Sequence, residues 1–136
     1  MAAGSYSFTI EQGATTDFEL VYKDSSGNPV DLTGYNARMQ LKDSRGGSTT
    51  YLTLSSSLGA DGTGLNLSGS GGLTAEKPLE SGSIGIYISH ATSSNLTFSS
   101  AFYDLEIVSG SGNTATVTRL VQGKVNLSKE VTTGNY

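Results

Sequence analysis

The chain has 136 residues, a formal net charge of −4, 18 glycines and no cysteine. This length suits one domain with a single core, and the lack of cysteine excludes disulfides, thiolate metal sites and a thiol nucleophile. Only eight Lys and Arg residues are spread along an acidic chain with a pI of about 4.7, which argues against nucleic acid as a partner.

The amino-terminal sequence Met1-Ala-Ala-Gly-Ser has neither the charged region nor the apolar region of a secretory signal. No run of about eighteen apolar residues, as a membrane-spanning helix requires, occurs anywhere. We therefore expect a protein that is made in the cytoplasm, is soluble there and has no membrane partner.

Alternation of apolar and polar residues predicts most of the strands, because side chains of a strand point to opposite faces in turn. Leu65 and Leu67 predict a further, weak edge strand within the Gly/Ser-rich segment 55–72. In chain order, the alternating segments are 6–11, 18–22, 37–41, 51–54, 84–88, 102–108 and 116–128.

Turn-forming residues separate these segments. The loop 24–29 contains Gly, Asn and Pro, and the run 109–113 joins the last two predicted strands into a β-hairpin. Residues 73–79 are compatible with a helical turn that Pro78 would end, and 91–98 predicts a single turn with Leu96 and Phe98 directed inward.

Eight or nine short strands at a spacing of roughly ten residues are typical of an all-β fold, either an antiparallel immunoglobulin-like β-sandwich or a small barrel. We predict the sandwich, as a single domain over 1–136. The termini, 1–5 and 132–136, and the loop 55–72 have too little apolar sequence to offset chain entropy. We expect them to be flexible and to order only on assembly.

The residue types that carry chemistry are too few or too scattered to predict an enzyme. His90 is the one histidine, so a zinc site built from His and Cys is excluded, and we expect His90 to lie on the surface or cap a loop. No Gly-x-Ser-x-Gly elbow supports a serine hydrolase. The motifs Gly62-Thr-Gly64 and Gly110-Ser-Gly112 lie between strands without a following helix, so they indicate turns and not phosphate loops.

The remaining polar candidates also have simple structural interpretations. Asp24, Asp31 and Asp61 are scattered loop carboxylates that do not visibly assemble the oxygen ligands of a Ca²⁺ site. Asp104 and Glu106 alternate with apolar residues, which predicts two carboxylates on the solvent face of one strand. We therefore predict no catalytic, cofactor-binding or metal-binding residues.

Arg119 allows two interpretations. Its alternation with Val117 and Val121 places it on the apolar side, where it would need an ion pair with Asp104 or Glu106. Alternatively, the core face of this strand carries Thr118 and Leu120, and Arg119 is solvated; this second interpretation is slightly favoured. The seven tyrosines leave a carbohydrate-binding platform open, although most of them continue the core alternation and tryptophan is absent.

Several phrases of the sequence resemble small structural proteins of tailed bacteriophages, and the first half is similar to the amino-terminal domain of upper-baseplate proteins. The phrases are Asp17-Phe-Glu-Leu-Val-Tyr-Lys-Asp, Gly27-Asn-Pro-Val-Asp-Leu-Thr-Gly-Tyr-Asn-Ala-Arg-Met-Gln-Leu, Tyr103-Asp-Leu-Glu-Ile and Val117-Thr-Arg-Leu-Val-Gln-Gly-Lys-Val-Asn-Leu-Ser.

The resemblance implies an immunoglobulin-like sandwich that assembles on the phage tail, without enzymatic activity. Its partners would be other virion proteins, of the tail, the baseplate or the major capsid protein, and further copies of itself. No fibre or stalk sequence follows the domain in this chain, so a decoration role on the phage head remains an alternative, and a carbohydrate- or receptor-binding module a further one. In each virion case the protein would be located in the virion after synthesis in the host cytoplasm.

Overall fold

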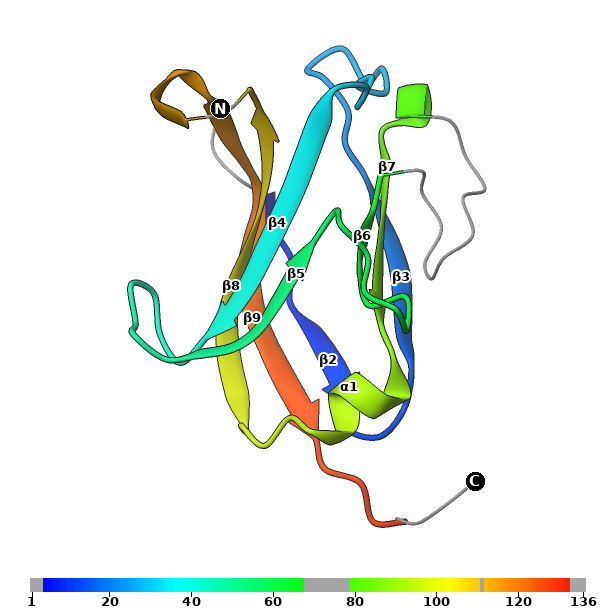
Figure 1. The fold of residues 1–136 in the computed structure, drawn as a ribbon, viewed down its shortest axis with the longest axis vertical. Coiled ribbons are helices and arrows are strands. Elements are labelled where there is room, and N and C mark those ends of the chain that lie inside the picture. Colours follow the sequence, from blue (N-terminus) through cyan, green and yellow to red (C-terminus); the bar gives the residue numbers. More distant parts are fainter. Residues whose placement is uncertain (1–3, 68–78, 111, 133–136) are drawn as a thin grey trace.

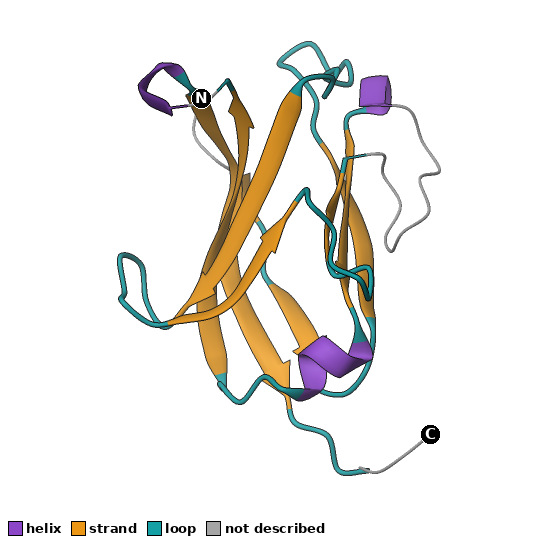
Figure 2. Ribbon diagram, in the orientation of Figure 1, coloured by secondary structure: helices purple, strands orange, loops and turns teal. Residues whose placement is uncertain are grey.

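The computed structural model describes residues 4–67, 79–110 and 112–132, which form a sandwich of two β-sheets (Figure 1). The described part contains nine strands, six in one sheet and three in the other. Its one α-helix is short and lies at one end of the sandwich (Figure 2). The predicted all-β, two-layer architecture is therefore confirmed.

The larger sheet, sheet A, has the order β1-β9-β8-β4-β5, and β2 pairs with the same edge of β9 as β1. Its centre is the predicted hairpin of β8 and β9. The strands are β1 (Gly4–Ser5), β2 (Phe8–Glu11), β4 (Tyr35–Lys42), β5 (Thr50–Ser55), β8 (Ser100–Ser109) and β9 (Thr116–Ser128).

The smaller sheet, sheet B, has the antiparallel order β3-β7-β6. The edge strand predicted from Leu65 and Leu67 is present as β6, which contains Leu65 and ends before Leu67. Residues 68–72 of the predicted loop and 73–78 of the predicted helical turn lie outside the described residues. The elements are β3 (Thr16–Val21), β6 (Gly64–Asn66) and β7 (Ser83–Ile88), with α1 (His90–Ser94) and the 3₁₀ turns η1 (Leu79–Ser81) and η2 (Gly112–Thr114).

The prediction of a wholly antiparallel sandwich is wrong for sheet A, which is mixed. Strands β1 and β2 run parallel to β9, with Phe8 opposite Val125 and Ile10 opposite Leu127. After β2 the chain crosses to sheet B instead of turning back beside its own strand, so the first and last strands meet in the same direction. Two residues of the amino-terminal segment, Gly4 and Ser5, are part of this pairing.

The core lies between the sheets and is formed largely by the apolar residues of the alternating segments predicted from the sequence. Ile84, Ile86 and Ile88 of β7 are buried, as predicted for the isoleucine strand, and Leu96 and Phe98 close the end beside α1 at 6% exposure each. The other buried apolar residues are Ile10, Leu32, Ala37, Met39, Leu41, Leu54, Leu65, Ala101, Tyr103, Leu105, Ile107, Val125 and Leu127.

A β-bulge in β9 changes the phase of the alternation. Leu105 of β8 pairs with Val121, but the next residue, Glu106, pairs with Arg119, so Leu120 is the extra residue. Leu120 and Val121 both line one apolar cavity of about 190 Å³ together with Leu105. Two consecutive residues of β9 therefore face inward, and Arg119 faces outward.

Between β1 and β2 the chain crosses closely over β9. The amide of Tyr6 donates to the carbonyl of Gln122, at 3.0 Å, and the hydroxyl of Tyr103 donates to the carbonyl of Tyr6. Gly123 lies directly beneath this crossing, where a Cβ atom would overlap the Tyr6 carbonyl. Burial, followed by the electrostatic effect of Tyr6, raises the pKa of Tyr103 to about 12.

Candidate interaction surface

The outer face of sheet A gathers cations that are dispersed in the sequence. Five of the eight Lys and Arg residues of the chain lie on this face or on the loop that borders it. They are Arg38 and Lys42 of β4, Arg45 of the β4–β5 loop, and Arg119 and Lys124 of β9. The sequence shows no basic stripe, and the pairing of three distant segments creates the cluster.

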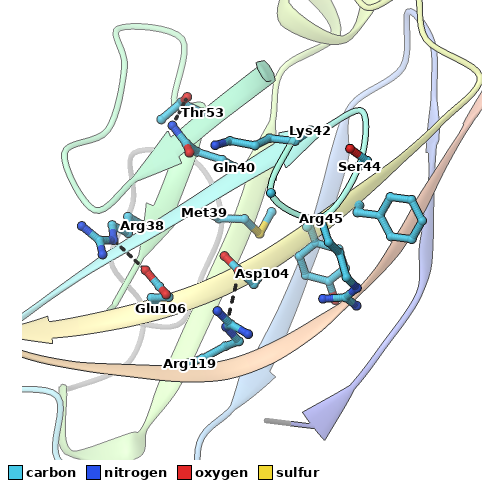
Figure 3. A pocket seen from close by; sticks show the side chains of 13 residues that line it. Arg38, Met39, Gln40, Lys42, Ser44, Arg45, Thr53, Asp104, Glu106 and Arg119 are labelled. Carbon is cyan, nitrogen blue, oxygen red and sulfur yellow. Dashed lines mark hydrogen bonds and ion pairs between the residues drawn. The ribbon is translucent and has the colours of Figure 1, made fainter. Parts of the chain in front are cut away.

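Two of these cations form ion pairs across neighbouring strands (Figure 3). Arg38 Nε lies 2.8 Å from Glu106 Oε1, and Arg119 Nε lies 3.3 Å from Asp104 Oδ2. Both arginine side chains are about half exposed, at 58% and 49%. Such solvated pairs typically contribute between about 0 and 1 kcal/mol to stability, so they organise the surface more than they stabilise the fold.

These contacts settle the predictions for the same residues. Asp104 and Glu106 lie on the outer face of one strand, as predicted. Arg119 is solvated, as in the interpretation that places Thr118 and Leu120 on the core face. It also pairs with Asp104, as in the interpretation that required an ion pair. Both were partly correct because the bulge turns Leu120 and Val121 inward together.

Phe102 is a half-buried aromatic ring on this charged face. The Arg45 guanidinium carbon lies 5.7 Å from the ring centroid, and Lys124 Nζ lies 5.4 Å from it. Arg45 Nη1 also donates to Gln122 Oε1 at 3.1 Å, which draws the β4–β5 loop over the sheet. Within the described part of the chain, no carboxylate forms an ion pair with Lys42, Arg45 or Lys124.

A concavity of about 470 Å³ opens on this face (Figure 3). One side of it carries the two ion pairs, and the other side carries Lys42, Ser44 and Arg45 at the start of the loop. The lining residues are Arg38, Met39, Gln40, Lys42, Ser44, Arg45, Gly46, Thr53, Phe102, Tyr103, Asp104, Glu106 and Arg119. The hollow is therefore bordered by hydrogen-bond donors and by an aromatic ring.

The group formed by Phe102, Arg45 and Lys124 was not predicted from the sequence. One signal was available, because Phe102 has the same strand parity as Asp104 and Glu106 and so had to share their outward face. The positions of Arg45 and Lys124 beside it depend on pairing between distant segments, which no local pattern reports.

The outer face of sheet A and the remainder of the molecule differ in formal charge. With its β4–β5 loop, the face carries five cations and the three carboxylates of Asp43, Asp104 and Glu106, a net charge of +2. The other described residues comprise two cations, Lys23 and Lys129, and eight carboxylates, a net charge of −6. The described chain is thus strongly bipolar.

Asp61 belongs to a separate polar cluster that ties the β5–β6 loop to α1. Its carboxylate accepts hydrogen bonds from the Thr63 amide at 3.0 Å, from Thr92 Oγ1 at 2.8 Å and from the Ser89 hydroxyl. These bonds, led by that from Ser89, hold the pKa of Asp61 far below its usual value. Ser89 is also the N-cap of α1, so the cluster has a structural explanation.

The other sequence candidates lie apart from one another. Asp24 Oδ1 accepts the amides of its own loop at residues 26 and 28, and Asp31 Oδ1 accepts the amide and the hydroxyl of Thr33. His90 is an exposed residue at the start of α1. Among residues 4–67, 79–110 and 112–132, no three His, Cys, Asp or Glu side chains are grouped as metal ligands would be.

The glycine motifs adopt turn conformations where they are described. Gly62, with a φ of 89°, precedes β6, and Gly64, with a φ of 152°, is the first residue of that strand. Gly110, with a φ of 85°, follows β8, and Gly112, with a φ of 62°, begins the 3₁₀ turn η2. Position 111 lies outside the described residues. The prediction that these motifs are turns is confirmed for Gly62, Gly110 and Gly112, whereas Gly64 belongs to the strand β6.

No helix among the described residues is long and apolar enough to span a membrane. No protein-family model matches the chain, and no curated protein matches it.

Proposed function

We propose that the fold is an immunoglobulin-like sandwich of the variable type. Seven-stranded immunoglobulin domains have a three-stranded sheet, and the variable type extends it with further strands at the edge. The order β9-β8-β4-β5 facing β3-β7-β6 corresponds to that extended arrangement. The mixed character of sheet A arises only from β1 and β2, which lie at its opposite edge.

We further propose that the protein is a non-enzymatic structural component of a tailed-bacteriophage virion, associated with the tail or baseplate. The observation that carries this proposal is where the charged side chains gather. They lie across the broad outer face of a sheet, on three strands and a loop, where they offer electrostatic complementarity to the surface of a partner protein. The phrases that resemble phage structural proteins supply the biological setting.

The repeated architecture of a virion suits this surface. Closed or helical assemblies reuse one interface in many copies, so a modest contact per copy suffices for a stable particle. Other virion proteins, such as tail, baseplate or major capsid proteins, and further copies of this chain are the proposed partners.

Mass spectrometry of purified virions, with heads and tails separated, tests this function. Stoichiometric recovery with the tails supports the tail or baseplate role, and recovery with the heads supports the alternative of a decoration protein on the capsid. Absence from both fractions would refute the virion proposal altogether.

A carbohydrate- or receptor-binding module is the second candidate, favoured by one observation. The half-buried ring of Phe102 borders a concavity with cations and hydrogen-bond donors around it, as in sites that stack a sugar and bind its acidic groups. Binding of the purified protein to a glycan array, lost in Phe102→Ala, would support this candidate. Equal array signals for the Phe102→Ala variant and the unchanged protein would exclude this site.

A further inference from the structure

We propose that the cations around Phe102, on the outer face of sheet A, bind the carboxylates of an extended acidic segment of another protein. This inference deepens the proposed function and rests on it, because the partner is then a neighbouring protein of the virion.

The outer face of sheet A repeats one arrangement from strand to strand. Strand β8 lies in the middle, and each outward residue of β8 has one partner on β4 and one on β9. In two successive rows the middle residue is a carboxylate between cationic or amide side chains. From β4 through β8 to β9, the first row is Arg38, Glu106 and Arg119, and the second row is Gln40, Asp104 and Gln122.

The third row departs from this arrangement at its centre. It places Phe102 between Lys42 and Lys124, so a ring occupies the position at which the other two rows hold a carboxylate. Neighbouring strands lie about 4.8 Å apart, which puts the backbones of the two lysines about 10 Å apart. The third row therefore has a cation on each side and no anion between them.

Arg45 of the β4–β5 loop brings a further cation to the third row. Its guanidinium carbon lies 5.7 Å from the centroid of the Phe102 ring, and Lys124 Nζ lies 5.4 Å from the same centroid. Arg45 and Lys42 also line the concavity of about 470 Å³, from its two sides (Figure 3). Three cations thus border one aromatic ring at the edge of a hollow.

The chain itself supplies no carboxylate to these three cations among its described residues, since the ion pairs on this face use Arg38 and Arg119. The adjacent acid in the sequence, Asp43, is directed at its own loop, because a Cβ atom at Gly47 would overlap Asp43 Oδ1. An anion from outside can therefore bind here, where the hollow excludes part of the water and strengthens ion pairs.

An acidic peptide segment fits this site better than a sugar does. Alternate side chains of an extended segment point to the same side about 7 Å apart, so two carboxylates can bind between flexible lysine side chains whose backbones are about 10 Å apart. A sugar would have to stack on the Phe102 ring, which already has Arg45 and Lys124 against it. The net charge of +2 on the face and its loop is complementary to an acidic protein surface.

Titration of the isotope-labelled full chain with a synthetic peptide of alternating threonine and glutamate, followed by NMR at about 20 mM salt, tests the site. We expect shifts of the amide signals in the third row and the β4–β5 loop, and no binding of the same peptide with glutamine for glutamate. Lys42→Glu/Lys124→Glu should raise the dissociation constant at least about tenfold. The matched control, Lys23→Glu/Lys129→Glu, changes the net charge equally outside the face and should bind like the unchanged protein.

Phe102→Glu tests the third row directly, because it places a carboxylate at the centre of the row. That carboxylate should engage Lys42 and Lys124 and abolish binding of the peptide. Phe102→Gln removes the ring equally but adds no charge, so it should weaken binding by no more than about fivefold. Thermal melts of each variant verify folding, and Lys42→Gln/Lys124→Gln replaces any variant that does not fold.

Four results would overturn the inference: no binding of the glutamate peptide, equal binding of the glutamine peptide, a control variant as weak as the reversal, or equal binding by Phe102→Glu and Phe102→Gln. Binding of oligogalacturonate in place of the peptide would overturn it in favour of the carbohydrate candidate. Recovery of the protein in virions without peptide binding would refute this inference alone, and peptide binding together with absence from virions would refute the proposed function alone.

Discussion

Replacing Gly123 by alanine probes the crossing of the amino-terminal segment over β9. An added Cβ would overlap the Tyr6 carbonyl oxygen and would lie 2.8 Å from the Tyr6 carbonyl carbon and 3.3 Å from Tyr103 Cε1. The closest neighbours are backbone atoms, which cannot rotate away as the end of a side chain can. Gly123 has no positive φ, so available space, and not backbone strain, decides the outcome.

The cost can be estimated from the contacts that must change. Overpacking of this kind typically costs about 1 to 3 kcal/mol. Displacing Tyr6 also weakens its hydrogen bond from Tyr103, worth about 1 kcal/mol. The reduced entropy of the unfolded chain returns roughly 0.4 to 1 kcal/mol. The free energy of unfolding should therefore fall by about 1 to 4 kcal/mol, which for a domain of this size lowers the Tm by roughly 4 to 15 °C.

The assay is thermal and urea unfolding followed by circular dichroism. Gly4→Ala is the matched control, because Gly4 lies in β1 on the same edge of β9 and its Cβ would make only an ordinary contact, 3.7 Å from the Leu120 carbonyl. We expect the control to unfold within a few degrees of the unchanged protein.

An unchanged or raised Tm for Gly123→Ala would show that the Tyr6 crossing does not form in solution. A Tm that fell equally in both variants would refute the specific role of the space above Gly123. The double variant with Tyr103→Phe provides a further check, since both changes act on the Tyr6 carbonyl and their free energies should not add.

Three further predictions concern single side chains. Folding raises the pKa of Tyr103 to about 12 from 10.0, so the stabilising effect of its hydroxyl is complete below pH 10 and is lost as the pH rises through 12. Between pH 10 and 12, Tyr103→Phe should therefore lose less stability than the unchanged protein, as measured by urea unfolding at a series of alkaline pH values. The pKa of Asp61 is lowered in the folded protein, so the contribution of its carboxylate to stability is present above pH 3.8 and lost on acidification. Asp61→Ala should therefore have a lower Tm than the unchanged protein at neutral pH, and this difference should shrink below pH 3.8. A difference that stayed constant with pH would contradict the role of the charge. Arg119→Ala should change the free energy of unfolding by less than about 1 kcal/mol, because its pair with Asp104 is solvated, and a larger loss in urea unfolding would show that the pair is shielded from water.

Much of the secondary structure could be predicted because its cause is local. Ile84, Ile86 and Ile88 alternate with small or polar residues, and a strand with one face in a core needs only that period. The single turn predicted within 91–98, which coincides with α1, and the inward Leu96 and Phe98 were predictable on similar grounds, since an apolar residue beside a short polar turn has one buried side to occupy.

The features that the sequence did not reveal depend on contacts between distant segments. A prediction from alternating residues assumes that the strand is regular, so it could not identify the bulge at Leu120. The bulge follows only from the pairing of Leu105 with Val121 and of Glu106 with Arg119. Parallel pairing of Phe8 with Val125 joins residues from the two ends of the chain, and no local pattern specifies such a partner.

The candidate surface was undetected for the same reason. Arg45, Phe102 and Lys124 belong to three separate segments and form a group only after β8 has paired with both β4 and β9. The sequence by itself determined where the strands lie and which side of each is apolar, because neighbouring residues carry that information. Only the tertiary structure decided which strands pair, where β9 changes phase and where the cations gather, because those outcomes depend on packing and hydrogen bonding between residues far apart in the chain.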